Sequence, residues 1–284
     1  MDRGRNRQVI AYYALAVLLF AAIFLSTFRS RAHRGQQVVE MVCFGDSVFT
    51  DIGDMAAIPD RLAELLDVSC YNASMGGTCA ARLEKERRLD SAKGSLSLVG
   101  LAKAVRSGDF GVQKSARIRD SNTELFPAIV EGLSELDFTQ VEIVLIEKGL
   151  NDYHDGVPID NPEDPYDAYS FLGALRSAVA DLRKVNPQVR IVYITPTYAW
   201  YTAWGLTCEE MDNGGGLLED YVDAGLALAE ELDIEAVDLY HDFFPHESWE
   251  DWELNMMDGL HPNEAGREKI ARRIADALQS AKAE

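Results

Sequence analysis

Residues 141–152 read VEIVLIEKGLND, an apolar run that turns abruptly into a polar loop. The segment 141–146 is short and rich in β-branched side chains, which is typical of a central strand. Gly149, Asn151 and Asp152 follow it, and these residue types favour a turn. The stretch therefore predicts a buried strand with polar side chains just beyond its carboxyl end.

The same alternation of an apolar run and a helical pattern recurs along the chain. Further strands are expected at 38–44, 68–71, 190–195 and 234–239. Helices are expected at 58–67, 169–185, 217–232 and 264–281, where apolar residues recur at helical spacing. Strands that alternate with helices predict an α/β fold, a three-layer α/β/α domain with a parallel sheet covered on both faces.

One segment departs from this alternation. Residues 84–126 contain helical patterns but no obvious strand, and we interpret them as a helical insertion. The insertion could form a lid or wall over a site, or a surface excursion. Because no Pro- or Ser-rich linker divides residues 35–284, a single domain is expected there.

The N-terminal segment predicts a membrane anchor. Residues 9–28 read VIAYYALAVLLFAAIFLSTF, twenty residues without a charge. As a helix they would span about 30 Å, roughly the hydrocarbon thickness of a bilayer. A cleaved secretory signal is the alternative, but its apolar core is usually roughly 7–15 residues and ends at a small-residue cleavage site. Here the run ends in Arg29, Arg31 and Arg34 instead.

The expected topology is a single pass, with residues 1–34 forming a cytoplasmic tail, the transmembrane helix and a basic flank. Three arginines also precede the span, so the positive-inside count is tied. A short tail before a first helix more often stays in the cytoplasm, which predicts a cell-membrane protein with an extracytoplasmic domain. Its lipid-bilayer contact would come through the anchor.

Composition narrows the choice of partner. The chain has 27 Lys and Arg against 47 Asp and Glu, a formal net charge of −20. No basic surplus exists to neutralise phosphates, so a nucleic-acid partner is not expected.

Four cysteines are too few for a disulfide scaffold at this length, and the sequence leaves open whether Cys70 pairs with Cys79.

Polar motifs follow several of the expected strands. The motif Gly45-Asp46-Ser47 comes after 38–44, NASMGG occupies 72–77 after the next strand, and the third is the Asn151 loop. A fourth, with Asp258 and His261, precedes the last helix. Functional groups gather at the carboxyl ends of strands in open parallel sheets, so these motifs are expected to converge.

In this order the motifs resemble the SGNH hydrolases, also called the GDSL esterase/lipase family. The four named residues of the family would be Ser47, Gly77, Asn151 and His261, with Asp258 three positions before the histidine. The resemblance covers most of residues 38–278 and implies a flavodoxin-like sheet with strand order 2-1-3-4-5. The first motif reads GDSVF, with valine where the family often has leucine.

The chemistry of these residue types fits the roles that the resemblance implies. Ser47 needs a base to become a nucleophile, His261 can take and return that proton, and Asp258 can orient the imidazole. The N–H groups of Ser47 and Gly77 and the amide of Asn151 would form the oxyanion hole. A glycine is expected at 77 because it lets the backbone approach the substrate closely.

Other side chains are candidates for substrate contact. His154 follows the Asn151 loop, and Trp200, Tyr201 and Trp204 follow the strand 190–195. The aromatic residues could stack on a sugar, line an acyl chain, or only pack beneath a loop. No metal and no cofactor are expected, since this chemistry needs neither.

The sequence thus predicts a membrane-anchored serine hydrolase that cleaves carboxylic esters through an acyl-enzyme. Removal of acetyl groups from cell-envelope or extracellular glycans is the expected reaction. A lipase or lysophospholipase activity and an O-acyltransferase activity with the same triad remain open, and a non-catalytic binding protein is a further alternative.

Overall fold

A five-stranded parallel sheet forms the centre of the fold, in the order β2-β1-β3-β4-β7. The strands are β1 Met41–Phe44, β2 Cys70–Asn72, β3 Ile143–Glu147, β4 Arg190–Ile194 and β7 Glu235–Val237. Each expected strand is present, and the order is the one that the family resemblance implies. Every residue of β1 and β3 is buried, as an apolar run without alternation predicts for a sheet covered on both faces.

The computed structural model describes residues 37–88, 92–116 and 125–280. The expected membrane span at 9–28 and its basic flank lie outside these ranges. Among the described residues, no helix combines the length and the apolar character needed to cross a bilayer.

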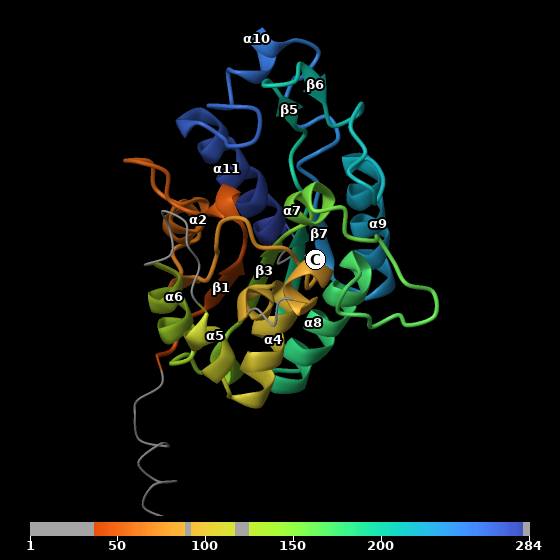
Figure 1. Cartoon of the computed structure of the whole chain (residues 1–284). Helices are drawn as coiled ribbons and strands as arrows, with labels where there is room; N and C mark the ends of the chain where they lie inside the picture. The colour runs from red at the N-terminus through yellow and green to blue at the C-terminus, as the bar shows by residue number, and fades with distance from the viewer. Residues whose placement is uncertain (1–36, 89–91, 117–124, 281–284) are drawn as a thin grey trace, which may run out of the picture. The chain divides into compact units, whose positions relative to one another are not determined.

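Helices cover the sheet in two layers (Figure 1). On one side α2 packs against α11, and on the other α4 and α9 both pack against α8. The main helices are α2 Ile58–Leu66, α4 Leu98–Ser107, α8 Phe171–Val185, α9 Leu218–Glu231 and α11 Glu264–Ser280. The shorter ones are α3 Glu84–Arg88, α5 Gly111–Ser115, α6 Leu125–Leu133, α7 Leu150–His154 and α10 Trp249–Trp252, with the 3₁₀ turns η1 Ser47–Phe49, η2 Ala92–Leu96 and η3 Phe138–Gln140. The four expected helices are confirmed as α2, α8, α9 and α11.

The segment 84–126 lies on the connection from β2 to β3, and its described residues contain helices only. Within it, α4 packs along α8 as part of one helical layer. Ser97 caps α4 by accepting a hydrogen bond from the N–H of Gly100, and Gly108 ends the helix in the left-handed conformation. This segment therefore supplies a helix that covers the sheet.

Strand register brings two loops together at the carboxyl edge of the sheet. Phe44 of β1 pairs with Ile146 of β3, so Gly45, which follows β1, lies beside Glu147, the last residue of β3. The loop after β2 reaches the same edge, where the N–H of Met75 donates to the carbonyl of Gly45. The motifs expected at three different strand ends thus meet in space.

A short hairpin not expected from the sequence lies beyond this edge. Strands β5 Trp200–Tyr201 and β6 Leu206–Thr207 pair antiparallel and stand apart from the main sheet (Figure 1). Each strand has two residues, which is too short to leave a periodic pattern in the sequence.

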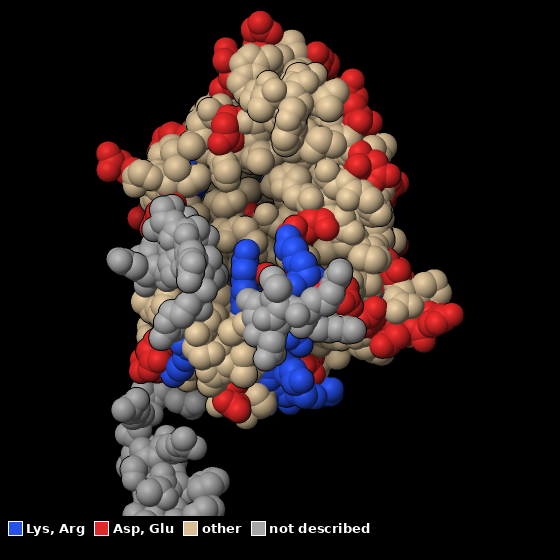
Figure 2. Space-filling view, viewed as in Figure 1, with Lys and Arg blue, Asp and Glu red and all other residues tan. Residues whose placement is uncertain are grey.

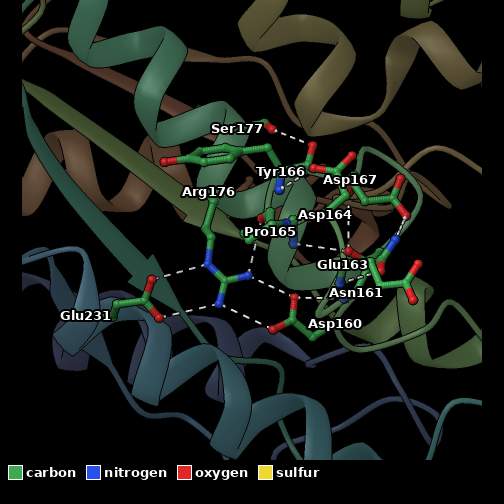
Figure 3. Close-up of polar contacts among 12 residues, drawn as sticks. Asp160, Asn161, Glu163, Asp164, Pro165, Tyr166, Asp167, Arg176, Ser177 and Glu231 are labelled. Atoms are coloured by element: carbon green, nitrogen blue, oxygen red, sulfur yellow. Dashed lines mark hydrogen bonds and ion pairs between the residues drawn. The ribbon is translucent and has the colours of Figure 1, made fainter.

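The loop between α7 and α8 is fastened by one arginine (Figure 3). The Arg176 guanidinium binds Asp160 of the loop, the carbonyl of Pro165 and Glu231 of α9. These bonds hold the segment that follows the Asn151 motif against the helical layer.

All four cysteines lie among the described residues, and none forms a disulfide. Cys70 has its sulfur 3.8 Å from that of Cys43 on the neighbouring strand. The sulfur of Cys79 lies instead 3.8 Å from a carboxylate oxygen of Asp155. The structure therefore does not pair Cys70 with Cys79.

Candidate active site

Ser47 begins a tight turn directly after β1. Oδ1 of Asp46 accepts a hydrogen bond of 2.9 Å from the N–H of Val48, which caps the 3₁₀ turn η1. The N–H of Gly45 donates to Oγ of Ser74 on the neighbouring loop. Local capping and the link to the second loop together fix the backbone that carries the serine.

The loop before α11 forms a carboxylate–imidazole pair. Oδ1 of Asp258 accepts the N–H groups of Leu260 at 2.7 Å and His261 at 2.6 Å. Its Oδ2 lies 2.8 Å from Nδ1 of His261. The three-residue spacing lets one aspartate shape the loop and orient the ring at the same time.

The other ring nitrogen of His261 faces Ser47. Nε2 lies 3.0 Å from Oγ of Ser47, within hydrogen-bond distance. Oγ, the imidazole and the Asp258 carboxylate form one continuous chain, which is the arrangement a serine nucleophile and its base require. The structure thus brings together the three residues expected to act in catalysis.

Asp258 and His261 each shift the pKa of the other. The hydrogen bond to Asp258 raises the pKa of His261 above its ordinary value, and the Asp258 and Asp46 charges add to this against the effect of burial. Burial alone would raise the pKa of Asp258, but the hydrogen bonds from the ring and backbone of His261 outweigh it and lower that pKa to about 2. The carboxylate is therefore ionised wherever the histidine titrates.

Asn151 lies on α7 and is oriented by Asp46. Its Nδ2 donates to Oδ2 of Asp46 over 2.8 Å and lies 3.5 Å from the carbonyl of Thr78. One carboxylate therefore holds both the serine turn and the asparagine amide. Among the described residues, neither the N–H of Ser47 nor that of Gly77 donates to another protein group.

Gly77 is required by backbone conformation. Its φ is +69°, and a Cβ at this position would meet no protein atom within 4 Å. The left-handed conformation disfavours residues with a side chain. The positive φ therefore gives a reason for glycine at this position, and the close approach to the substrate stays a prediction.

Gly259, in contrast, is required by close packing. Its carbonyl accepts a 2.9 Å hydrogen bond from the N–H of Trp200 on β5, and a Cβ on Gly259 would lie 1.6 Å from the Trp200 carbonyl oxygen. This contact docks the β5–β6 hairpin on the loop that carries Asp258 and His261.

Three of the four candidate contact residues lie close together. Nε2 of His154 is 2.7 Å from the hydroxyl of Tyr201, and the rings of Tyr201 and Trp204 lie 5.9 Å apart. Burial lowers the pKa of His154, which favours a neutral ring. Trp204 is 66% exposed. Trp200 instead packs its ring edge-on against Trp249, away from this group of contacts.

Buried charged residues beneath the motifs were not expected from the sequence. Glu147, the last residue of β3, and Lys148, which follows it, are both buried, and the Glu147 carboxylate accepts the N–H of Asp46 over 3.0 Å. Asp152 accepts the N–H groups of Ala80 at 2.8 Å and Ala81 at 3.0 Å. The sequence did hold a signal for this, since Glu147 and Lys148 directly continue an apolar run. Charged residues are rarely buried without partners, so their position indicated buried partners nearby.

Arg267 of α11 is a second buried cation. Its guanidinium donates to the carbonyls of Thr50, Ala56 and Pro262. Thr50 follows the serine turn and Pro262 follows His261. Arg267 therefore ties together the two loops whose side chains meet at Ser47 and His261.

A pocket of about 280 Å³ opens beside the serine turn. Asp51 and Asp60 line one part of it, and Phe126 and Ile129 of α6 line another. Gly76, next to Gly77 in the chain, also borders the pocket. In Figure 2 acidic side chains are spread around the edge of the visible face, and a hollow opens beside the position of α7 in Figure 1.

The described residues contain no group of three or more His, Cys, Asp and Glu side chains arranged to hold a metal ion. His241 contacts Asp238, Glu219 and Asp223 at the surface. Nδ1 of His246 lies 2.9 Å from the carbonyl of Phe244.

The model of the GDSL-like lipase/acylhydrolase family matches residues 43–269, well over half of the chain. The chain belongs to this family. Membership indicates ester hydrolysis in general, and the expected resemblance is confirmed. None of the curated proteins compared with the sequence matches it significantly.

Several solved structures share the fold of this GDSL-like protein. A possible lipase from Chitinophaga pinensis is 18% identical, covers 86% of this chain and 99% of its own, and has a TM-score of 0.57. A protein from Lactobacillus plantarum is 19% identical, covers 85% of this chain and 96% of its own, and has a TM-score of 0.59. At these identities the likeness concerns the fold.

Proposed function

We propose that this protein is a serine esterase that hydrolyses carboxylic esters through an acyl-enzyme on Ser47. The observation that carries the proposal is the continuous chain from Oδ2 of Asp258 through the imidazole of His261 to Oγ of Ser47. Family membership supports ester hydrolysis in general.

In the first half of the reaction, Nε2 of His261 accepts the Ser47 proton as Oγ attacks the ester carbonyl. The carbonyl π electrons move onto oxygen, and the imidazolium is stabilised by Asp258. When the tetrahedral intermediate collapses, the bond to the alcohol breaks and His261 returns the proton to the leaving oxygen. In the second half, water takes the place of Ser47 as the nucleophile and releases the acid.

The negative charge on the intermediate needs donors that are already in position. The N–H groups of Ser47 and Gly77 and the second Nδ2 hydrogen of Asn151 are the three we assign. The first hydrogen of that amide is held by Asp46 over 2.8 Å, and the only competing acceptor for the amide among the described residues is the Thr78 carbonyl, at the longer distance of 3.5 Å. Losing one such donor typically costs on the order of 3 kcal/mol of barrier.

We further propose that the substrate is an acylated glycan outside the cytoplasm and that residues 9–28 anchor the enzyme in the cell membrane. The uncharged run of twenty residues supports the anchor. The exposed Trp204 beside Tyr201 supports a sugar-stacking face. Asp51 and Asp60 at the pocket disfavour an acyl group that ends in a carboxylate.

A lipid ester is the second candidate substrate. Leu254 and Met257, which precede the catalytic aspartate, are exposed together with Trp204. Exposed apolar side chains near a catalytic loop favour contact with acyl chains. An acyltransferase would use the same three catalytic residues, and added acceptor alcohols would then compete with water.

The test is turnover of p-nitrophenyl esters by the protein and by its Ser47→Ala variant. We expect hydrolysis of p-nitrophenyl acetate by the first and none by the second, with the fold intact by circular dichroism. Equal turnover by both would refute the proposal. A series of acyl lengths separates the substrates, since a preference for eight or more carbons would favour the lipid ester.

A further inference from the structure

Lys148 is a buried cation between the turns that flank the oxyanion hole. Lys148 directly follows β3 in the chain and is 2% exposed. Nζ lies 2.6 Å from the carbonyl oxygen of Gly45, 2.8 Å from Oγ1 of Thr78 and 3.2 Å from the carbonyl oxygen of Thr78. Gly45 lies two residues before Ser47, and Thr78 directly follows Gly77.

The three acceptors match the three N–H groups of an ammonium ion. A neutral amine has two N–H groups and would leave one of these oxygens without its donor. Burial lowers the pKa of Lys148, and the charges of Asp46, Glu147 and Asp152 act in the opposite direction. The hydrogen bonds and these carboxylates are what the charged form needs in order to persist in the interior.

The same cation reaches the third donor indirectly. The Thr78 carbonyl that accepts from Nζ also lies 3.5 Å from Nδ2 of Asn151. Lys148 and Asn151 both leave the carboxyl end of β3, one just before and one within α7. The three proposed oxyanion donors are therefore linked through one ammonium ion and the carbonyls of Gly45 and Thr78.

We propose that Lys148 is a positioning residue for the oxyanion hole, where its ammonium ties the Ser47 turn to the Gly77 turn and adds a fixed buried positive charge beside both. The proposal rests on the esterase function proposed above. Donors stabilise an oxyanion only when they are held in place before the charge develops, and a link anchored on a central strand provides this.

A purely structural role makes a different prediction. If Lys148 only stabilised the fold, its loss would reduce the number of correctly folded sites, and each remaining site would turn over normally. If it positions the oxyanion donors, each folded site would be slower. Turnover per active site therefore distinguishes the two roles.

The variant is Lys148→Met, which keeps an unbranched side chain one atom shorter and removes the charge and the donors. Active sites are counted with a fluorophosphonate, and kcat per counted site and KM are measured with p-nitrophenyl acetate. We expect kcat per site to fall by about 10-fold or more, with KM changed by less than about three-fold. Binding of a trifluoromethyl ketone, which forms a tetrahedral adduct, should weaken by a similar factor.

Arg190→Met is the matched control. Arg190 is the first residue of β4, at the amino ends of the strands and therefore away from the site. Its guanidinium binds Glu235 and the carbonyl of Leu278. Its loss should lower the melting temperature and leave kcat per site unchanged. A Lys148→Met enzyme whose kcat per site stays within about two-fold of the parent overturns the proposal.

If Lys148→Met does not fold, Thr78→Val decides the question, because it removes Oγ1, which accepts from Nζ of Lys148 and donates to the carbonyl of Met75. We expect kcat per site to fall by about three-fold or more, and an unchanged value overturns the proposal. Failure of the esterase function itself is distinguishable, since the parent protein would then neither hydrolyse the ester nor react with the fluorophosphonate.

Discussion

Nε2 of His261 lies 3.0 Å from Oγ of Ser47, although the two residues are 214 positions apart in the chain. Ser47 is held by the turn after β1, and His261 is held by the loop before α11. Arg267 binds carbonyls on both segments. The separation of the two reacting atoms therefore depends on packing at the edge of the sheet.

The pH profile should reveal the coupling of Asp258 to His261. Only the neutral imidazole can accept the Ser47 proton, so kcat/KM should rise with pH through a midpoint above about 6.5. In Asp258→Asn the cause that raises the pKa of His261 is removed, so the midpoint should move to lower pH. The plateau of kcat should fall by roughly 10⁴-fold, since the ring loses its orienting partner. A midpoint that did not move would contradict the coupling.

Asn151→Ala should slow the chemical step. The variant loses one oxyanion donor, so kcat should fall by about 10²–10³-fold with little change in KM. Stopped-flow measurement of the acylation burst with p-nitrophenyl acetate would check this. A loss confined to KM would assign Asn151 to ground-state binding instead.

Gly77→Ala tests the positive φ at the second motif. The alanine meets no steric obstacle, but the left-handed conformation costs roughly 1–2 kcal/mol, and relief of that strain would turn the N–H away. The activation free energy of hydrolysis should therefore rise by more than the free energy of unfolding falls. Gly108→Ala is the control, because Gly108 has a φ of +66° with no atom near its Cβ and ends α4 outside the site. It should lose a similar stability and keep its activity per site.

Arg267→Met tests the link between the serine and histidine loops. The substitution leaves buried carbonyls without their donor, and the free energy of unfolding should fall by roughly 3 kcal/mol. Urea denaturation would measure the change. Arg272→Met on the same helix is the control: Arg272 is 64% exposed and pairs with Glu268, so its loss should cost below about 1 kcal/mol. Equal losses would show that the buried links do not stabilise the fold.

The fold was predictable because its signals are local. Buried parallel strands leave short apolar runs, as at β1 and β3, and helices α8 and α11 leave a 3.6-residue period. The site was predictable because the motifs stand at strand ends, which a parallel sheet brings to one edge. The hairpin β5–β6 was not predicted, because two-residue strands have no period.

The buried cations could not be read from the sequence in the same way. Lys148 and Arg267 have the same residue types as solvated surface cations, and only the packed chain shows that they are buried. Their partners are mainly backbone carbonyls, and a carbonyl carries no signature in the sequence. Likewise, the requirement for glycine at Gly259 comes from the backbone of Trp200, far away in sequence.

The most direct test of the account is the site of covalent attachment of a fluorophosphonate, located by peptide mass spectrometry. We expect one adduct per chain, on Oγ of Ser47. The adduct should be absent in Ser47→Ala, and it should be lost in His261→Ala because the serine reacts more slowly without its base. An adduct on any other residue, or none on a folded protein that hydrolyses p-nitrophenyl acetate, would contradict the account.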